Sequence, residues 1–156
     1  MTENEAISRL QKMCSQQEKC LSDISRKLTE WKIPASKAEN ILEKLLKDKF
    51  VDESRYSKSF VKDKFKFNGW GKVKLKSALR QKKIDEKIIH EALEEIDETE
   101  YIASVNRLLK KKRKTLKDRD KNIIKAKLIK FIQSKGFEFS VIQQALHQVL
   151  KEDGRK

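Results

Sequence analysis

The chain has 156 residues, of which 40% are charged and 37% hydrophobic, and its formal net charge is +14. This composition is too rich in aliphatic side chains for a disordered protein, and no apolar run approaches the roughly 20 residues that cross a bilayer. One proline and four glycines punctuate long segments of residues that favour helix, which predicts an all-α chain. Because the N-terminus also lacks the basic start and apolar centre of a signal peptide, we expect a cytoplasmic protein without a membrane segment.

Residues 1–49 predict three helices in succession. The first carries apolar residues at helical spacing, namely Ala6, Ile7, Leu10 and Met13. Ser15 to Glu18 has the form of a capping box, which would open the second helix, and Pro34 suits the start of the third.

Residues 50–97 predict three more helices around an unusual turn. Asp52 and Asp85 are suited to cap the first and third of these helices. Between them, Gly69-Trp70-Gly71 interrupts the helical pattern. Gly69 can adopt positive φ at the end of a helix, and Gly71 allows the backbone to approach whatever the next helix faces.

The same pattern of helix, turn with one apolar residue, and helix occurs three times. Residues 74–93 align with residues 127–146 at an offset of 53, and with residues 23–42 at an offset of 51, so that apolar residues coincide. With a further helix before each copy, the sequence predicts about nine helices in three tandem three-helix repeats, residues 1–49, 50–97 and 98–156. Units of this size bury little area alone, so we expect them to pack on their neighbours as an elongated array.

The positive charge is concentrated in two blocks. Residues 62–83 carry 9 basic and 1 acidic side chain and residues 107–130 carry 12 and 2, whereas residues 84–106 carry 1 and 8. Since a solvated surface usually mixes its charges, separate basic blocks indicate a polyanionic partner. Lysine-rich helix faces also occur without any partner, and the acidic block either meets a basic protein surface or balances the neighbouring lysines.

One predicted helix places four cations along a stripe. Lys72, Lys76, Arg80 and Lys83 recur at i, i+4, i+8 and i+11, on the side opposite Leu75. Cations at this spacing repel one another, which favours an external anion as the reason for the stripe. The candidate residues for binding DNA or a protein–DNA filament are Lys72, Lys74, Lys76, Arg80, Lys82, Lys83, Lys111, Lys112, Arg113, Lys114 and Lys127.

Two strings in the second repeat carry a family resemblance. FVDESRYSKSFVKDKF, residues 50–65, and NGWGKVKLKSALRQKKIDEKIIHEAL, residues 68–93, resemble the signature region of the RecX family, bacterial regulators of the RecA recombinase. The family's pattern there is an acidic pair, an Arg-Tyr/Phe pair, Gly-aromatic-Gly, and a Leu-Arg-x-Lys-Gly-Ile/Val segment. The signature residues that match and that we expect at an interface are Arg55, Tyr56, Gly69, Trp70 and Gly71.

The resemblance implies tandem three-helix repeats that bind along the groove of the RecA–DNA filament and inhibit strand exchange, ATP hydrolysis and coprotease activity. It also implies a monomer with no cofactor, whose partners are the recombinase filament and single- and double-stranded DNA. The alternative is a stand-alone nucleic-acid-binding protein that uses its basic faces without a recombinase partner.

The chain departs from the family pattern in two places. Lys32 and Lys83 stand where the family tends to have glycine, and only the third copy keeps it, as Gly136. If these turns are left-handed, each lysine costs about 1 kcal/mol relative to glycine. Residues 110–122, KKKRKTLKDRDKN, form a much more basic linker in place of the glycine turn of the second repeat.

Nothing in the sequence predicts an enzyme or a metal site. Cys14 and Cys20 lack a CxxC pattern or a zinc-finger histidine, so we expect reduced thiols packed as small apolar groups. His90 and His147 are isolated on predicted helices, and no phosphate-binding GxxxxGK[ST] loop is present. An enzyme acting on nucleic acid is therefore the least favoured class.

Overall fold

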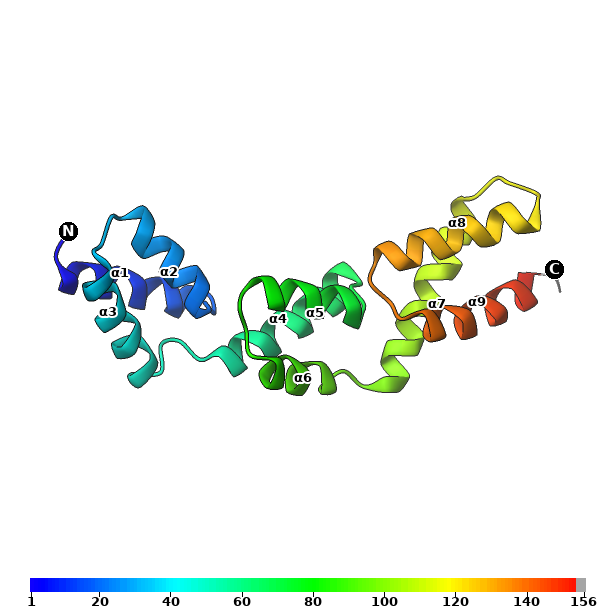
Figure 1. Ribbon diagram of the computed structural model, residues 1–156. Helices are drawn as coiled ribbons and strands as arrows, with labels where there is room; N and C mark the ends of the chain where they lie inside the picture. Colours follow the sequence, from blue (N-terminus) through cyan, green and yellow to red (C-terminus); the bar gives the residue numbers. More distant parts are fainter. Residues whose placement is uncertain (154–156) are drawn as a thin grey trace. The chain divides into compact units, whose positions relative to one another are not determined.

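The computed structural model describes residues 1–153, which form nine α-helices and no strand (Figure 1). The all-α prediction is confirmed over these residues. The helices are α1 (Glu3–Gln16), α2 (Leu21–Glu30), α3 (Ala35–Lys47), α4 (Glu53–Asn68), α5 (Lys72–Gln81), α6 (Glu86–Glu94), α7 (Glu98–Thr115), α8 (Lys121–Ser134) and α9 (Phe139–Asp153).

The first three helices enclose a small aliphatic core. Ala6, Leu10, Ile24, Ile41 and Leu45 are fully buried in it. The predicted capping box at Ser15 is wrong, because α1 continues to Gln16 and the Ser15 hydroxyl donates to the carbonyl of Gln11 at 2.9 Å. The chain instead enters α2 at Cys20, whose N–H donates to Asp23 Oδ2 at 3.4 Å.

The predicted caps of the second repeat are present. Asp52 Oδ1 accepts from the N–H of Arg55 at 3.0 Å at the start of α4, and Asp85 Oδ1 accepts from the N–H of Lys87 at 2.8 Å at the start of α6. Leu75 and Leu79 of α5 are fully buried, as their spacing predicts. The two caps give partners to N–H groups that have none within their own helices, and the two leucines bury the apolar face of α5.

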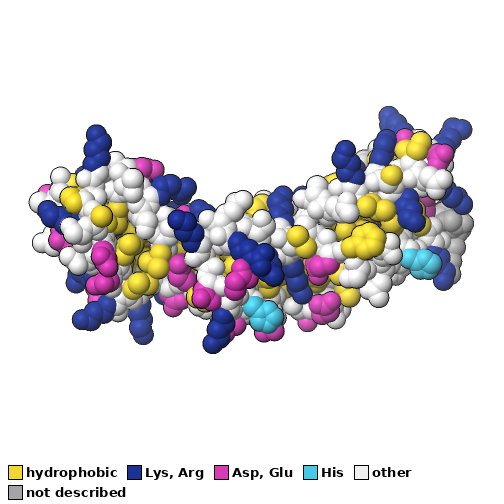
Figure 2. Space-filling model, in the orientation of Figure 1, with side chains coloured by type: hydrophobic (Ala, Val, Ile, Leu, Met, Phe, Trp, Pro, Cys, Tyr) yellow, Lys and Arg dark blue, Asp and Glu magenta, His cyan; other side chains and the backbone are white. Residues whose placement is uncertain are grey.

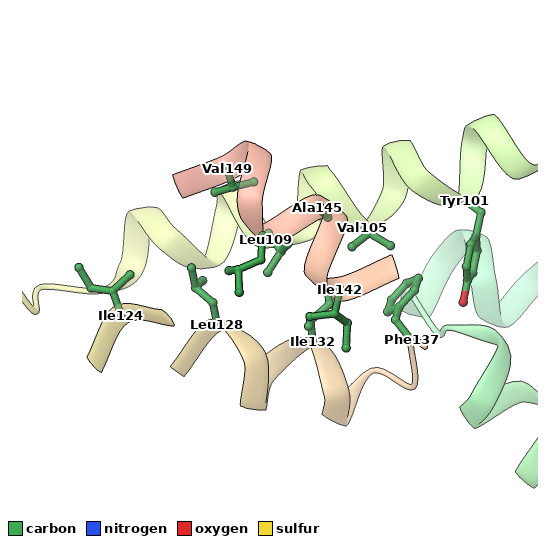
Figure 3. Close-up of a cluster of buried hydrophobic side chains, with 11 residues drawn as sticks. Tyr101, Val105, Leu109, Ile124, Leu128, Ile132, Phe137, Ile142, Ala145 and Val149 are labelled. Carbon is green, nitrogen blue, oxygen red and sulfur yellow. The ribbon is translucent and has the colours of Figure 1, made fainter. Parts of the chain in front are cut away.

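The last three helices enclose a larger core that is closed by aromatic rings. Figure 3 shows aliphatic side chains of α7, α8 and α9 facing one another, with Phe137 and Tyr101 at one end and Ile124 at the other. The linker predicted over residues 110–122 is too long. Because α7 continues to Thr115, only residues 116–120 connect it to α8.

Three lysines adopt the left-handed conformation at helix ends. Lys32 and Lys83 have φ of 56° and 62°, so the turns keep the geometry that glycine would favour, and Lys49 has φ of 61°. Each follows the hydrogen-bond pattern of a Schellman motif; at Lys83, for example, the N–H donates to the Arg80 carbonyl and the next N–H to the Leu79 carbonyl. The motifs therefore form despite the side chain.

The chain divides into two compact units that differ from the repeat boundaries predicted from the sequence. Unit 1 comprises residues 1–60 and 79–92, and unit 2 comprises residues 61–78 and 93–156. The middle repeat thus shares its packing with both of its neighbours. Among the described residues, no helix combines the length and apolar character that a membrane span requires.

Candidate nucleic-acid interface

Five of the predicted DNA-binding cations are held by carboxylates of the chain itself. Their ion pairs are Lys72 to Glu98 at 3.5 Å, Arg80 to Glu86 at 2.6 Å, Lys82 to Asp23 at 2.6 Å, Arg113 to Asp153 at 3.0 Å and Lys127 to Asp118 at 2.8 Å. The stripe predicted on α5 is therefore partly neutralised, at Lys72 and Arg80. These cations have a structural partner before any anion arrives.

The other six predicted cations make no ion pair within residues 1–153. They are Lys74, Lys76, Lys83, Lys111, Lys112 and Lys114. Two of these, Lys74 and Lys112, lie over aromatic rings instead. These lysine–ring contacts identify a surface that the spacing of cations along a single helix does not reveal.

Lysines gather around three aromatic rings of unit 2. Lys64 and Lys74 lie 5.2 and 4.6 Å from the Trp70 ring centroid, Lys66 lies 5.5 Å from that of Phe67, and Lys112 and Lys135 lie 5.1 and 6.0 Å from that of Phe131. We call these eight residues the aromatic–lysine cluster.

One lysine joins the two halves of the cluster. Lys135 reaches the Phe131 ring and also donates to the Asn68 carbonyl at 3.2 Å, next to Phe67. Phe67 is 75% exposed, and Trp70 and Phe131 are half-buried. Lys66, Lys74, Lys112 and Lys135 make no ion pair among the described residues.

Such a surface suits a single strand of nucleic acid on energetic grounds. A lysine over an exposed ring contributes about 0.5–1 kcal/mol, whereas a base stacked on an aromatic ring contributes about 1–3 kcal/mol. A base can therefore replace the lysine over the ring, and the displaced ammonium group is then available to pair with a phosphate. The rings accept bases of any sequence because every base has an aromatic face.

The glycines around Trp70 have a structural role within unit 2. Gly69 ends α4 with φ of 67°, as predicted. A Cβ on Gly71 would lie 2.4 Å from the Gly136 carbonyl oxygen, so only glycine allows this contact. The close neighbour that the sequence left unspecified is the turn between α8 and α9.

Carbonyl groups of the same turn, together with the Tyr101 hydroxyl on α7, accept hydrogen bonds from the N–H groups at the start of α5. Gly71 donates to the Lys135 carbonyl at 2.7 Å, Val73 donates to the Gly136 carbonyl at 2.9 Å, and Lys72 donates to the Tyr101 hydroxyl at 2.9 Å. The Tyr101 hydroxyl in turn donates to Glu138 Oε1. Burial raises the pKa of Tyr101, which keeps its hydroxyl protonated as a donor. Because these three N–H groups are occupied, they are not available to bind an anion.

The signature residues Arg55 and Tyr56 make their contacts inside unit 1. The Arg55 guanidinium donates to Glu18 Oε1 at 2.6 Å and to the carbonyls of Lys49 and Phe50, at the end of the first repeat. Tyr56 is buried and stacks on Phe60. Sequence reasoning placed both at an interface with a partner, whereas these contacts are internal.

The two units differ in charge. Unit 1 has 16 basic and 13 acidic side chains, and unit 2 has 22 and 11, so unit 2 holds +11 of the total +14. Figure 2 shows Lys and Arg side chains gathered over α8 and the connection before it. No group of three or more His, Cys, Asp or Glu side chains capable of holding a metal occurs within the described residues.

The two cysteines and two histidines behave as the sequence predicts. Cys14 and Cys20 are free thiols, and Cys20 is buried. Burial raises the pKa of both, which leaves them as weakly reactive thiols. His90 and His147 are exposed on α6 and α9.

Comparison with known proteins yields consistent matches. Residues 52–93 match the model of the second three-helix domain of RecX, and residues 98–146 match that of the third. The regulatory protein RecX of Clostridium acetobutylicum is 33% identical over 135 residues, which cover 84% of this chain and 62% of the relative. That of Pelodictyon phaeoclathratiforme is 30% identical over 124 residues, which cover 80% and 76%. That of Clostridium tetani is 31% identical over 118 residues, and the chain spans 54% of its length.

Solved structures show the same fold. A crystal structure of a regulatory protein RecX superposes with a TM-score of 0.84 at 27% identity, covering 92% of this chain and 70% of that one. The crystal structure of RecX from Lactobacillus salivarius also gives a TM-score of 0.84 and covers 94% of this chain and 96% of that one. At 18% identity the second likeness concerns the fold alone. Tandem three-helix domains, as predicted, are thereby confirmed.

Proposed function

This chain belongs to the RecX family of regulatory proteins, and from that membership we propose that it regulates a RecA-type recombinase by binding the filament formed on DNA. In this proposal the chain acts in the cytoplasm as a monomer without cofactor or catalysis. It lies along the filament groove and inhibits strand exchange, ATP hydrolysis and coprotease activity. The recombinase half of the proposal rests on the family.

The nucleic-acid half of the proposal rests on the aromatic–lysine cluster. Its four lysines without ion pairs, Lys66, Lys74, Lys112 and Lys135, can each release a condensed counterion from a phosphate. Phe67, at 75% exposure, supplies a ring on which a base can stack. We assign this cluster, in place of the α5 stripe, as the main contact to single-stranded DNA.

Binding in a filament groove accounts for inhibition by two physical routes. A chain that covers DNA within the groove excludes an incoming duplex. A chain that bridges adjacent recombinase subunits also resists the subunit rearrangements that accompany nucleotide turnover. Both routes need only binding energy, so no catalytic residue is required.

The cluster is tested by the salt dependence of binding to an oligomer of thymidine. Each phosphate contact on a single strand contributes about 0.7 to the slope of log K against log salt, so Lys66→Gln, Lys74→Gln, Lys112→Gln and Lys135→Gln together should lower the slope by about 3. A matched variant removes the same charge from unit 1, at Lys12, Lys32, Lys37 and Lys47, and should leave the slope unchanged. Equal slopes in the two variants would show that the cluster does not contact phosphate.

The stacking contribution needs a separate variant. Phe67→Ala removes an exposed ring without opening the core, and it should weaken binding to the oligomer by about 1–3 kcal/mol at every salt concentration. Loss of charge and loss of the ring therefore have different signatures, a change of slope for the first and a parallel shift for the second.

The recombinase partner is tested with purified filament. The chain should inhibit DNA-stimulated ATP hydrolysis, and it should bind nucleotide-stabilised filament more tightly than the naked DNA inside it. Unchanged ATP hydrolysis at stoichiometric excess, together with equal affinity for filament and naked DNA, would leave the alternative, a stand-alone nucleic-acid-binding protein.

A further inference from the structure

A second surface of unit 2, separate from the aromatic–lysine cluster, has the form of a groove. The groove lies between the first turns of α8 and the last turns of α9 and has a volume of about 490 Å³. Ile124, Leu146 and Leu150 are its apolar lining, and Lys121, Lys125 and Lys151 belong to the same walls. We call it the α8/α9 groove.

The charge of the groove is not neutralised from within. Lys121, Lys125 and Lys151 make no ion pair among residues 1–153. The one acidic residue of the walls, Asp153, is held by Arg113 at 3.0 Å, on α7. His147 and Gln143 complete the polar walls. The groove therefore presents three cations and no free carboxylate to a ligand.

The apolar floor distinguishes the groove from a simple phosphate site. Ile124 and Leu146 are each 3% exposed, and Leu150 is half-buried against the same core. Figure 3 shows Ile124 at the outer end of that core, beyond Leu128. Nucleic acid stacks on aromatic faces, whereas an aliphatic floor suits the aliphatic anchors of a helix laid into a groove.

We propose that the α8/α9 groove binds an acidic, amphipathic segment of a protein partner, with aliphatic side chains on the floor and carboxylates against Lys121, Lys125 and Lys151. Charge complementarity selects the acidic segment, and the volume, within the usual range of about 300–1,000 Å³ for ligand pockets, accommodates one or two of its side chains. Hydrophobic anchors spaced four residues apart lie on one face of a helix, which suits a groove whose apolar lining comes from two helices.

This site lies partly outside the family match. The match to the third RecX domain ends at residue 146, so His147, Leu150 and Lys151 come after it. None of the three belongs to the aromatic–lysine cluster. A protein at the groove and DNA at the cluster would therefore contact different side chains.

The proposal is tested with the full chain and a synthetic peptide, without recombinase or DNA. The probe is a fluorescein-labelled peptide of twelve residues, with two leucines four residues apart and aspartate or glutamate elsewhere; anisotropy measures its affinity. A first control peptide carries alanine for both leucines, and a second carries glutamine for the acidic residues. We expect each control to bind at least five-fold more weakly than the probe.

Two charge reversals locate the binding. Lys121→Glu with Lys125→Glu should weaken probe binding at least five-fold, because both residues line the groove. Lys114→Glu with Lys117→Glu changes the net charge equally on exposed residues outside it and should change the affinity less than two-fold. As an independent readout, the ring proton signal of His147 should move on titration while that of His90, in unit 1, stays in place.

Three results would overturn the proposal. The alanine peptide could bind as tightly as the probe, which would reduce the groove to nonspecific charge. The two reversal pairs could weaken binding equally, with a stationary His147 signal. Finally, an oligomer of twelve thymidines could displace the probe from the groove. If Lys121→Glu with Lys125→Glu then weakened binding of this oligomer more than binding of the probe, the groove would be a phosphate site. None of these results bears on the recombinase proposal.

Discussion

Replacing Gly71 by alanine should destabilise unit 2 more than the same replacement at Gly69, the other glycine beside Trp70. The added Cβ would lie 2.4 Å from the Gly136 oxygen, 2.6 Å from the Gly136 carbonyl carbon and 2.7 Å from the Phe137 nitrogen. All three are backbone atoms, so no side-chain rotation relieves the overlap. The start of α5 must move away from the turn between α8 and α9.

The magnitude follows from what that movement disrupts. Overpacking costs about 1–3 kcal/mol, and each of the hydrogen bonds from Gly71 and Val73 to the turn contributes about 1 kcal/mol. We therefore expect a loss of about 3 kcal/mol in the free energy of unfolding. With a urea dependence of about 2 kcal/mol per molar, the unfolding midpoint falls by about 1.5 M.

Tryptophan fluorescence can follow this change in unit 2 alone. The chain has two tryptophans, Trp31 in unit 1 and Trp70 in unit 2, so a Trp31→Phe background leaves one reporter. Gly69→Ala is the matched control, because it meets only Leu108 side-chain atoms at 3.4 Å and costs about 1 kcal/mol through its positive φ. If Gly71→Ala lowers the midpoint no more than Gly69→Ala does, the close backbone contact is not what holds α5 in place.

Three further predictions concern unit 1 and the turns. Lys83→Gly should raise the free energy of unfolding by about 1 kcal/mol, because it relieves the φ of 62°, whereas Lys83→Ala should not; equal effects in urea titrations would contradict this. Lys82→Met removes the 2.6 Å ion pair to Asp23. Because the Asp23 carboxylate is mostly buried, this loss should lower the free energy of unfolding by about 1–2 kcal/mol at pH 7. Burial alone would raise the pKa of Asp23, but hydrogen bonds from Lys82 and Cys20 lower it below 3.8, so this stability is present above pH 3.8 and the variant and wild type should converge as the pH falls further. Ser57→Ala should leave stability unchanged or raise it by up to about 1 kcal/mol, since the Ser57 hydroxyl is buried without a hydrogen bond; a loss above 1 kcal/mol in thermal unfolding would refute this.

Local features were predictable from the sequence because they depend on neighbours along the chain. Asp52 and Asp85 cap helices that begin immediately after them, and Leu75 and Leu79 follow a period that only a helix buries on one side. Helix ends were less predictable. Ser15 has the right residue type for a cap, but α1 continues past it, and residues 110–115 are helical despite their dense positive charge.

The candidate site could be predicted only in part, because it depends on residues distant in sequence. The carboxylates that neutralise Lys72 and Lys82 lie 26 and 59 positions away, and no helical spacing relates them. The contact of Lys135 with Asn68 likewise spans 67 positions. A usable signal was present all the same, since aromatic residues recur within both basic blocks or at their edges, at Phe67, Trp70 and Phe131.

The dependence of α5 on the turn between α8 and α9 affects when α5 can form during synthesis of the chain. During synthesis, Gly71 to Val73 emerge well before the acceptors at Tyr101, Lys135 and Gly136, and water must serve their N–H groups in the interval. Nascent chains stalled before residue 136 should therefore show α5 frayed at its start, and its amide protons should gain protection from exchange only once the last helices are released.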